Sequence, residues 1–230
     1  MTSTVFLALS HALLILPPGH RQETHAKPAH ETTAEVEFSA MVKLVLTAFG
    51  KFHGVTNNPT KDILQQIQSV RNFQNSVYKD IIYTALVEVS AEGASEHLRR
   101  IRKSIQNKYP TEKIVFIHMG VHGTASMIHL ENTAWNLMDF RVPDERNQQP
   151  REELIVKDNN LKFLETKINI EKLLNFDGLK GKAKRSIDPG RFVCNFIFFS
   201  SLHLNHTKIN ETSIFVHVSR FSAYLSNQCN

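Results

Sequence analysis

The sequence predicts an α/β domain in which a mostly parallel, open sheet lies between two layers of helices. Short β-branched runs alternate with longer segments whose apolar residues recur at helical spacing. The run Ile114 to His118 is continuously apolar, which is typical of a strand buried on both faces. Because strands and helices alternate along the chain, we expect a three-layer α/β/α arrangement with active-site residues at the carboxyl ends of the strands.

The elements of the first half follow in order from their patterns. Val42 to Thr47 and Ile81 to Val89 are β-branched apolar runs and predict strands. A helix from Ala94 to Ile105 is predicted before the strand at Ile114. Another helix is predicted between the first two strands, with one apolar face made of Ile63, Leu64, Ile67, Val70 and Phe73.

The second half is less regular. Residues 120–151 contain prolines, amides and charges, and such a long connection usually carries function. Ile168 to Phe176 predicts a short helix. A Pro189-Gly190 turn then leads into a helix with the apolar face Phe192 to Phe199, and Ser213 to Val218 predicts the last strand.

The composition indicates one domain with a sizeable core. The chain has 230 residues, of which 41% are hydrophobic and 9% aromatic. Its formal charge of +5 comes from scattered Lys and Arg. A local cluster at Arg99, Arg100, Arg102 and Lys103 shares its stretch with helically spaced apolar residues, so we interpret it as a solvated helix face and expect no nucleic-acid partner.

Cysteine usage favours a reduced, cytoplasmic protein, because Cys194 and Cys229 are the only cysteines. A secreted or lumenal protein is the alternative. Val5 to Leu16 is a short apolar run that resembles the core of a signal peptide, but no Lys or Arg precedes it and it is too short to span a membrane. Glycosylation sequons at Asn205 and Asn210 would matter only in that alternative.

The N-terminal part has the composition of a flexible extension. Residues 17–40 are rich in Pro, His, Thr, Glu and Ala without a sustained period. The predicted organisation is therefore an extension over residues 1–40 and a folded domain over residues 41–230. Translation from Met1 and translation from Met41 both remain open.

Cys194 is a candidate nucleophile. It follows the Pro-Gly turn and falls in the first turn of the predicted helix, where backbone N–H groups and the helix dipole favour a thiolate over a thiol. The alternative is a small hydrophobic side chain buried among Phe192, Phe196 and Phe199.

His217 and Glu131 are candidate partners of that cysteine. His217 ends an alternating strand, where it could reach a nucleophile on a neighbouring loop, or it could be an ordinary core or surface histidine. Glu131 directly follows an apolar stretch and could orient the imidazole as a third catalytic residue, or it could be a solvated charge.

Several motifs, taken together, resemble the pyroglutamyl-peptidase I family of cysteine peptidases, also called pyrrolidone-carboxylate peptidases. The resemblance runs from about Met41 to about Val218 and implies a phosphorylase/hydrolase-like fold. Its motifs are Leu46-Thr-Ala-Phe-Gly-Lys-Phe52 with Asn58-Pro59, Met119-Gly-Val-His-Gly123 with Leu130-Glu131, Arg141-Val-Pro-Asp144, Asp188-Pro-Gly-Arg-Phe-Val-Cys-Asn195 and Phe215-Val-His-Val218.

The resemblance implies an omega-peptidase that hydrolyses the bond after an N-terminal pyroglutamyl residue, with no metal or cofactor. In that reaction Cys194 attacks the carbonyl, His217 transfers the proton and Glu131 holds the imidazole. Backbone N–H groups near Cys194 and the loop carrying Arg141 would hold the oxyanion. The implied substrate-binding residues are Phe49, Phe52, Asn58, Arg141, Phe192 and Val193.

The same resemblance leaves an alternative function open. Members of the family normally continue past the catalytic histidine into a loop and a long amphipathic helix, so we expect that helix to be missing here and apolar sheet surface to be exposed. Ala48, Lys51, Glu145, Pro189 and Ser219 also depart from the family pattern. A catalytically impaired or truncated relative that acts as a binding or interaction protein is therefore the second hypothesis, and a homo-oligomer remains open.

Overall fold

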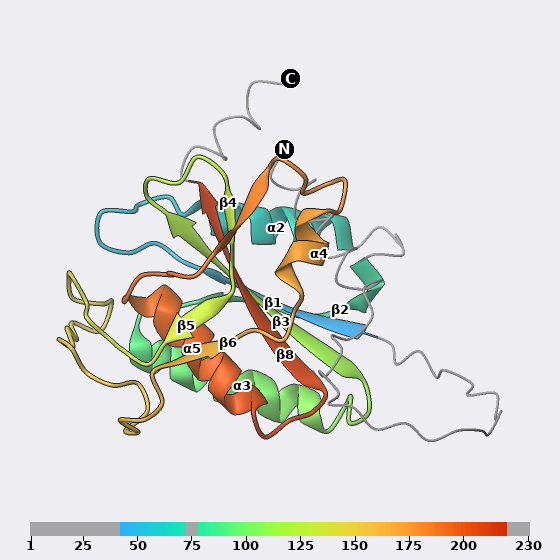
Figure 1. Ribbon diagram of the computed structural model, residues 1–230. Coiled ribbons are helices and arrows are strands. Elements are labelled where there is room, and N and C mark those ends of the chain that lie inside the picture. The colour runs from blue at the N-terminus through green and yellow to red at the C-terminus, as the bar shows by residue number, and fades with distance from the viewer. Residues whose placement is uncertain (1–41, 72–77, 220–230) are drawn as a thin grey trace, which may run out of the picture.

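A computed structural model describes residues 42–71 and 78–219 and contains one six-stranded sheet, in the order β2-β1-β3-β8-β4-β7 (Figure 1). The predicted N-terminal extension, Phe73 and the segment after Ser219 lie outside the described residues. The strands of this sheet are β1 (Val42–Phe49), β2 (Ile81–Val87), β3 (Lys113–His122), β4 (Ile128–Glu131), β7 (Ala183–Ser186) and β8 (Glu211–Ser219).

The sheet is mostly parallel, as predicted. β1 pairs in parallel with β2 and β3, and β3 with β8. The one antiparallel pairing joins β4 to β8, and β7 then runs parallel to β4. A separate two-stranded sheet joins β5 (Thr133–Trp135) to β6 (Phe163–Glu165). The expectation of an irregular segment over residues 120–151 was therefore wrong in part, because β4 and β5 lie within it.

Helices cover both faces of the sheet. In Figure 1, α2 (Pro59–Arg71) and α4 (Ile170–Leu174) lie on one side, and α3 (Ala91–Gln106) and α5 (Val193–Asn205) on the other. A short 3₁₀ helix, Tyr78–Asp80, precedes β2. This confirms the predicted three-layer α/β/α fold.

The alternation predicted for the last strand decides which side chains reach each layer. Ile214, Val216 and Val218 belong to the core under α2 and α4. Phe215 belongs to the core under α5. His217 is in phase with Phe215, so the alternation of β8 turns its imidazole toward the layer that carries Cys194.

The basic cluster on α3 is only partly solvated, which corrects the expectation for Arg102. Arg99, Arg100 and Lys103 are exposed. The Arg102 guanidinium instead lies 4.3 Å from the centre of the Phe116 ring, donates to the Ser201 carbonyl at 3.1 Å and pairs with Glu211 at 3.2 Å. Burial lowers the pKa of Arg102 to about 10 even though Glu211 opposes this shift.

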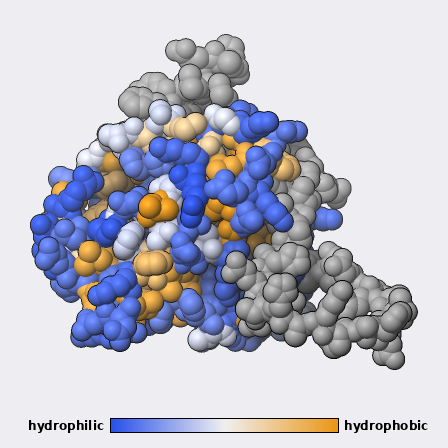
Figure 2. Space-filling view, viewed as in Figure 1, coloured by the Kyte–Doolittle hydropathy of each residue, from blue (hydrophilic) through white to orange (hydrophobic). Residues whose placement is uncertain are grey.

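The surface in Figure 2 carries hydrophobic residues in several patches among hydrophilic ones. Within the part of the chain that the structure describes, no helix combines the length and apolar character that crossing a membrane requires. Of the two sequon asparagines, Asn210 is exposed, whereas Asn205 is buried and its amide donates to Ser213 Oγ at 2.8 Å. The side chain of Asn205 is thus inaccessible in the folded domain.

Candidate active site

Cys194 is the second residue of α5, at the point where the turn at Pro189 and Gly190 enters the helix. Gly190 has a φ of 80°, a backbone conformation that glycine adopts readily. The residue before the helix, Phe192, makes no side-chain capping hydrogen bond. A Cβ placed on Gly120 of β3 would lie 2.9 Å from the sulfur of Cys194, so the glycine allows the thiol to approach the sheet closely.

The structure brings Cys194, His217 and Glu131 together, although they come from α5, β8 and β4. Nδ1 of His217 lies 2.8 Å from Oε1 of Glu131, and His217 also forms a hydrogen bond with Cys194. His217 is 3% exposed and Glu131 is fully buried, so Glu131 is not the solvated charge of the alternative interpretation. The antiparallel pairing of β4 with β8 places Glu131 opposite Phe215 and positions its carboxylate beside the imidazole.

The surroundings of His217 favour its charged form. Burial lowers the pKa of His217, but the hydrogen bonds to Cys194 and Glu131, with the charges of both groups, outweigh burial and raise it to about 9. The imidazole therefore holds its proton at neutral pH. A protonated histidine beside a cysteine stabilises the thiolate, which is the nucleophilic form.

Several aromatic rings border the site, and they belong to the same core cluster as Cys194, between the sheet and the layer of α3 and α5. The Phe192 ring lies 4.7 Å from that of Phe140 and 6.1 Å from that of Phe52. Phe49 is 3% exposed and packs on Phe215, whose ring lies 4.7 Å from the His217 ring. Phe140 was missed in the sequence, although it directly precedes the Arg141-Val-Pro-Asp144 motif.

Comparisons with known proteins identify the family of this chain. A family model described as pyroglutamyl peptidase matches residues 42–228. The chain belongs to this family. The pyrrolidone-carboxylate peptidase of Thermococcus litoralis is 29% identical over 167 residues, which cover 72% of this chain and 70% of that protein. That of Bacillus licheniformis is 28% identical over 180 residues, covering 76% and 77%.

Solved structures of the same kind confirm the fold. The pyrrolidone carboxyl peptidase of Fervidobacterium islandicum AW-1 has a TM-score of 0.65 and 26% identity, and the match covers 77% of this chain and 81% of that one. A mutant pyrrolidone carboxyl peptidase of Pyrococcus furiosus has a TM-score of 0.64 and 26% identity, covering 77% and 80%. The resemblance seen in the motifs is therefore confirmed as family membership.

In this pyroglutamyl peptidase family member, Asn58 braces the loop after β1. Its Nδ2 donates to the Gly50 carbonyl at 2.9 Å, and its Oδ1 accepts from the Thr60 backbone N–H at 3.2 Å. The side chain is 2% exposed. Its amide is thus used within the loop that carries Phe52, and any effect on a substrate would pass through that loop.

Val193 and Arg141 differ in what they present to the site. Val193 is fully buried in the core under α5, so only its backbone is free to contact a ligand. Arg141 is exposed, and its carbonyl accepts from Gln149 Nε2 at 3.1 Å. The loop that carries Arg141 continues into a set of polar contacts with α3.

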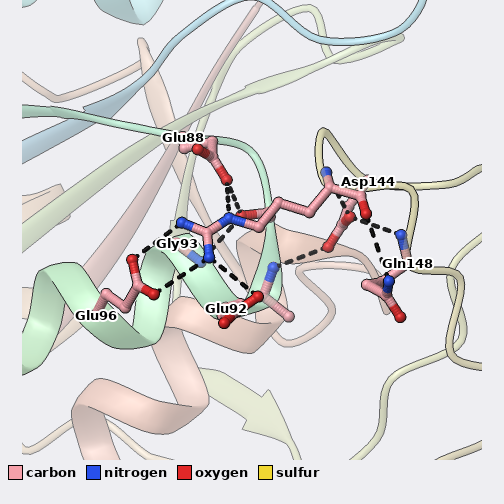
Figure 3. A network of polar contacts seen from close by, with 9 residues as sticks. Glu88, Glu92, Gly93, Glu96, Asp144 and Gln148 are labelled. Atoms are coloured by element: carbon pink, nitrogen blue, oxygen red, sulfur yellow. Dashed lines mark hydrogen bonds and ion pairs between the residues drawn. The ribbon is translucent and has the colours of Figure 1, made fainter.

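Asp144 and Arg146 fasten this loop to the start of α3, and Figure 3 shows the contacts. Asp144 accepts from the Ala91 backbone N–H at 3.1 Å and from the Gln148 N–H at 3.0 Å. The Arg146 guanidinium pairs with three carboxylates, those of Glu88 at 2.6 Å, Glu92 at 3.0 Å and Glu96 at 2.9 Å. Sequence reasoning missed Arg146, because its partners lie 50 to 58 residues away along the chain.

Two further histidines, His122 and His129, surround the pair formed by His217 and Glu131. The His122 ring lies 5.5 Å from the His217 ring and 4.9 Å from the His129 ring, and His129 Nδ1 is 4.0 Å from Glu131 Oε1. Burial lowers the pKa of both residues. Across residues 42–71 and 78–219, no group of three or more His, Cys, Asp or Glu side chains is arranged to hold a metal ion.

Proposed function

We propose that the chain is a cysteine-type pyroglutamyl peptidase that hydrolyses the peptide bond after an N-terminal pyroglutamyl residue. The observation that carries this proposal is the buried imidazole of His217, which is hydrogen-bonded both to Glu131 and to Cys194. Family membership supplies the substrate class. A free thiol nucleophile is best preserved in a reducing compartment, so we place the enzyme in the cytoplasm.

The reaction follows from the roles of the three groups. The Cys194 thiolate attacks the pyroglutamyl carbonyl carbon, and the electron pair of the C=O bond moves onto oxygen. His217 donates its proton to the leaving amine as the C–N bond breaks, which leaves a thioester on Cys194. His217 then takes a proton from water, which attacks the thioester and releases pyroglutamate and the thiolate. Glu131 orients the imidazole throughout.

The aromatic border suits the substrate. Pyroglutamate is a flat, neutral lactam, so its pocket needs apolar walls and a few hydrogen bonds for the ring N–H and C=O. Phe52, Phe140 and Phe192 would supply the walls, with Phe49 beneath them and Asn58 bracing the loop. The first-turn N–H groups of α5, which include those of Val193 and Cys194, and the loop carrying Arg141 would hold the oxyanion.

The direct test is hydrolysis of a pyroglutamyl-coumarin amide. The wild type should release the fluorophore, and Cys194→Ala should lower kcat by about 10³-fold or more, as loss of a nucleophile does in serine peptidases. A prolyl-coumarin amide, which lacks the lactam carbonyl, should not be cleaved. Equal rates for wild type and Cys194→Ala would reject the triad. Calorimetric binding of a pyroglutamyl peptide without turnover would instead support the binding-protein alternative.

A further inference from the structure

Trp135, the only tryptophan in the sequence, contacts both ends of the turn that leads to Cys194. Its indole Nε1 donates to the Ile187 carbonyl at 3.0 Å, where the turn begins. The Arg191 guanidinium lies 4.9 Å from the centre of the indole ring, where the turn ends. The indole ring also lies 5.7 Å from the ring of Phe163 of β6.

The backbone around Trp135 is tied to the first turn of α5 by the side chain of Asn195. Oδ1 of Asn195 accepts from the Trp135 N–H at 2.8 Å, and Nδ2 donates to the carbonyls of Trp135 and Leu137, both at 2.9 Å. Asn195 is fully buried. The Asp139 N–H donates to the Arg191 carbonyl at 3.1 Å, so the segment 135–139 holds the turn and the helix start together.

These contacts determine which backbone N–H groups at the start of α5 are available to a ligand. Asn195 is the third residue of α5, from which a polar side chain often reaches back to the start of its helix. Here its amide is used by Trp135 and Leu137, and Phe192 has no side-chain group that could cap. Among residues 42–71 and 78–219, no side chain at the helix start accepts from the first-turn N–H groups of α5, so the direction of these groups depends on how the 187–195 segment is held.

We infer that Trp135 is a positioning residue for the oxyanion: it holds the turn so that the first-turn N–H groups of α5 point at the developing charge. The contacts of Trp135 with Ile187, Arg191, Phe163 and Asn195 involve neither the imidazole of His217 nor the carboxylate of Glu131. Its effect should therefore appear in the transition state and not in substrate binding or thiol activation. This inference rests on the proposed peptidase function.

The test is Trp135→Phe, which keeps an aromatic ring but removes the donor to Ile187. We expect kcat to fall by about tenfold, less than the 10²- to 10³-fold cost of deleting an oxyanion donor, because the donors stay present but are held less well. KM and the affinity for 2-pyrrolidone, a ground-state lactam, should change by less than about twofold. Alkylation of Cys194 by iodoacetamide, measured in a Cys229→Ser background, should keep its rate.

A pyroglutamyl aldehyde separates the two kinds of effect. The Cys194 sulfur adds to the aldehyde carbon and forms a hemithioacetal whose oxygen occupies the oxyanion position. The affinity of Trp135→Phe for this aldehyde should therefore fall in parallel with kcat. Phe163→Leu, which removes the aromatic neighbour on β6 and leaves the bond to Ile187, is the matched control and should stay within about twofold of wild type. Thermal melts of both variants report whether the fold is retained.

Two results would overturn the inference in an active enzyme. One is an unchanged kcat and aldehyde affinity in Trp135→Phe. The other is an equal loss of aldehyde affinity, 2-pyrrolidone affinity and alkylation rate, which would show a general disturbance of the site. If the wild type neither hydrolyses the amide nor forms the aldehyde adduct, the proposed function fails first and this inference fails with it.

Discussion

Two buried histidines on neighbouring strands, His217 of β8 and His118 of β3, have opposite charge preferences. His118 is fully buried and its Nδ1 lies 2.7 Å from the hydroxyl of Thr47. Its pKa is lowered to about 3 by burial, with the charges of Arg102 and His97 adding to the effect. The pKa of His217 is raised to about 9.

The difference teaches that an anionic partner, and not burial, decides whether a buried histidine in this sheet favours its charged form. Burial lowers the pKa of both residues. His217 overcomes burial because the Glu131 carboxylate and the Cys194 sulfur contact it, whereas a hydroxyl offers His118 no charge. His118 also lies two residues before Gly120, which pairs with His217, so His118 is set back from the carboxyl edge where the site lies.

Removing the Glu131 carboxylate should reduce the difference in pKa between His217 and His118 and have the largest effect of the changes considered. Glu131→Gln keeps the size of the side chain but removes its charge, so the pKa of His217 should fall from about 9 while Cys194 still opposes the effect of burial. We expect kcat to fall by about 10³- to 10⁴-fold, as for the equivalent change in serine peptidases. Steady-state kinetics and NMR titration of the imidazole would measure the two effects.

The matched control is Glu165→Gln. It makes the same chemical change at an exposed residue of β6 whose carboxylate accepts from Asn132 at 2.8 Å. It should leave kcat near the wild-type value. A Glu131→Gln enzyme that retained wild-type kcat would show that the carboxylate contributes nothing to the reaction.

The second effect is on stability in acid, and it comes from His118. Because the folded-state pKa of about 3 lies below the ordinary value of 6.5, the unfolded chain binds more protons between these pH values. The free energy of unfolding should therefore fall as the pH drops below 6.5, by up to about 1.4 kcal/mol per pH unit for this residue. His97, with a pKa lowered to about 4 mainly by burial, adds to the slope.

His118→Asn tests this slope, since the amide can still bond to Thr47 but does not titrate. Urea unfolding between pH 7 and pH 4 should show a shallower loss of stability than in wild type, whatever the variant's stability at pH 7. Identical slopes would contradict the assignment. His217 should affect stability at the opposite end of the pH range. The stability that its proton provides is complete below pH 6.5 and is lost as the pH rises through about 9.

Local patterns predicted the fold well where they were strong. The apolar runs at Val42, Ile81, Ile114 and Ser213 all became strands of the large sheet. β4, β5, β6 and β7 were missed because each is only three or four residues long, and segments such as Ala183–Ser186 carry charged side chains in place of a β-branched run. Short polar strands are formed by their neighbours and leave little signal in their own sequence.

The candidate site could be predicted only in part, for a related reason. Cys194, His217 and Glu131 each had an ordinary structural interpretation, and the family resemblance selected the catalytic one. The residues that hold the site depend on contacts across long stretches of chain, such as Asn195 with Trp135 and Arg146 with Glu88. Neither helical nor strand periodicity carries information about such pairs.

Added salt should weaken the partly exposed ion pairs of Arg146 but not the buried pair of Glu131 and His217. This is the smallest of the expected effects. Arg146 is about a third exposed, and its pKa is raised by hydrogen bonds to Glu96, Glu88 and Glu92. Arg146→Gln frees the loop that carries Phe140 and Arg141, so we expect KM for the pyroglutamyl-coumarin amide to rise by about three- to tenfold with little change in kcat.

In about 1 M NaCl, where the Debye length is about 3 Å, the wild-type KM should approach that of the variant. The kcat, to which we propose that Glu131 and His217 contribute, should not respond, because both side chains are buried. Lys103→Gln, an equal loss of charge at an exposed position of α3, is the control. An equal rise of KM in both variants would assign the effect to net charge and not to the loop.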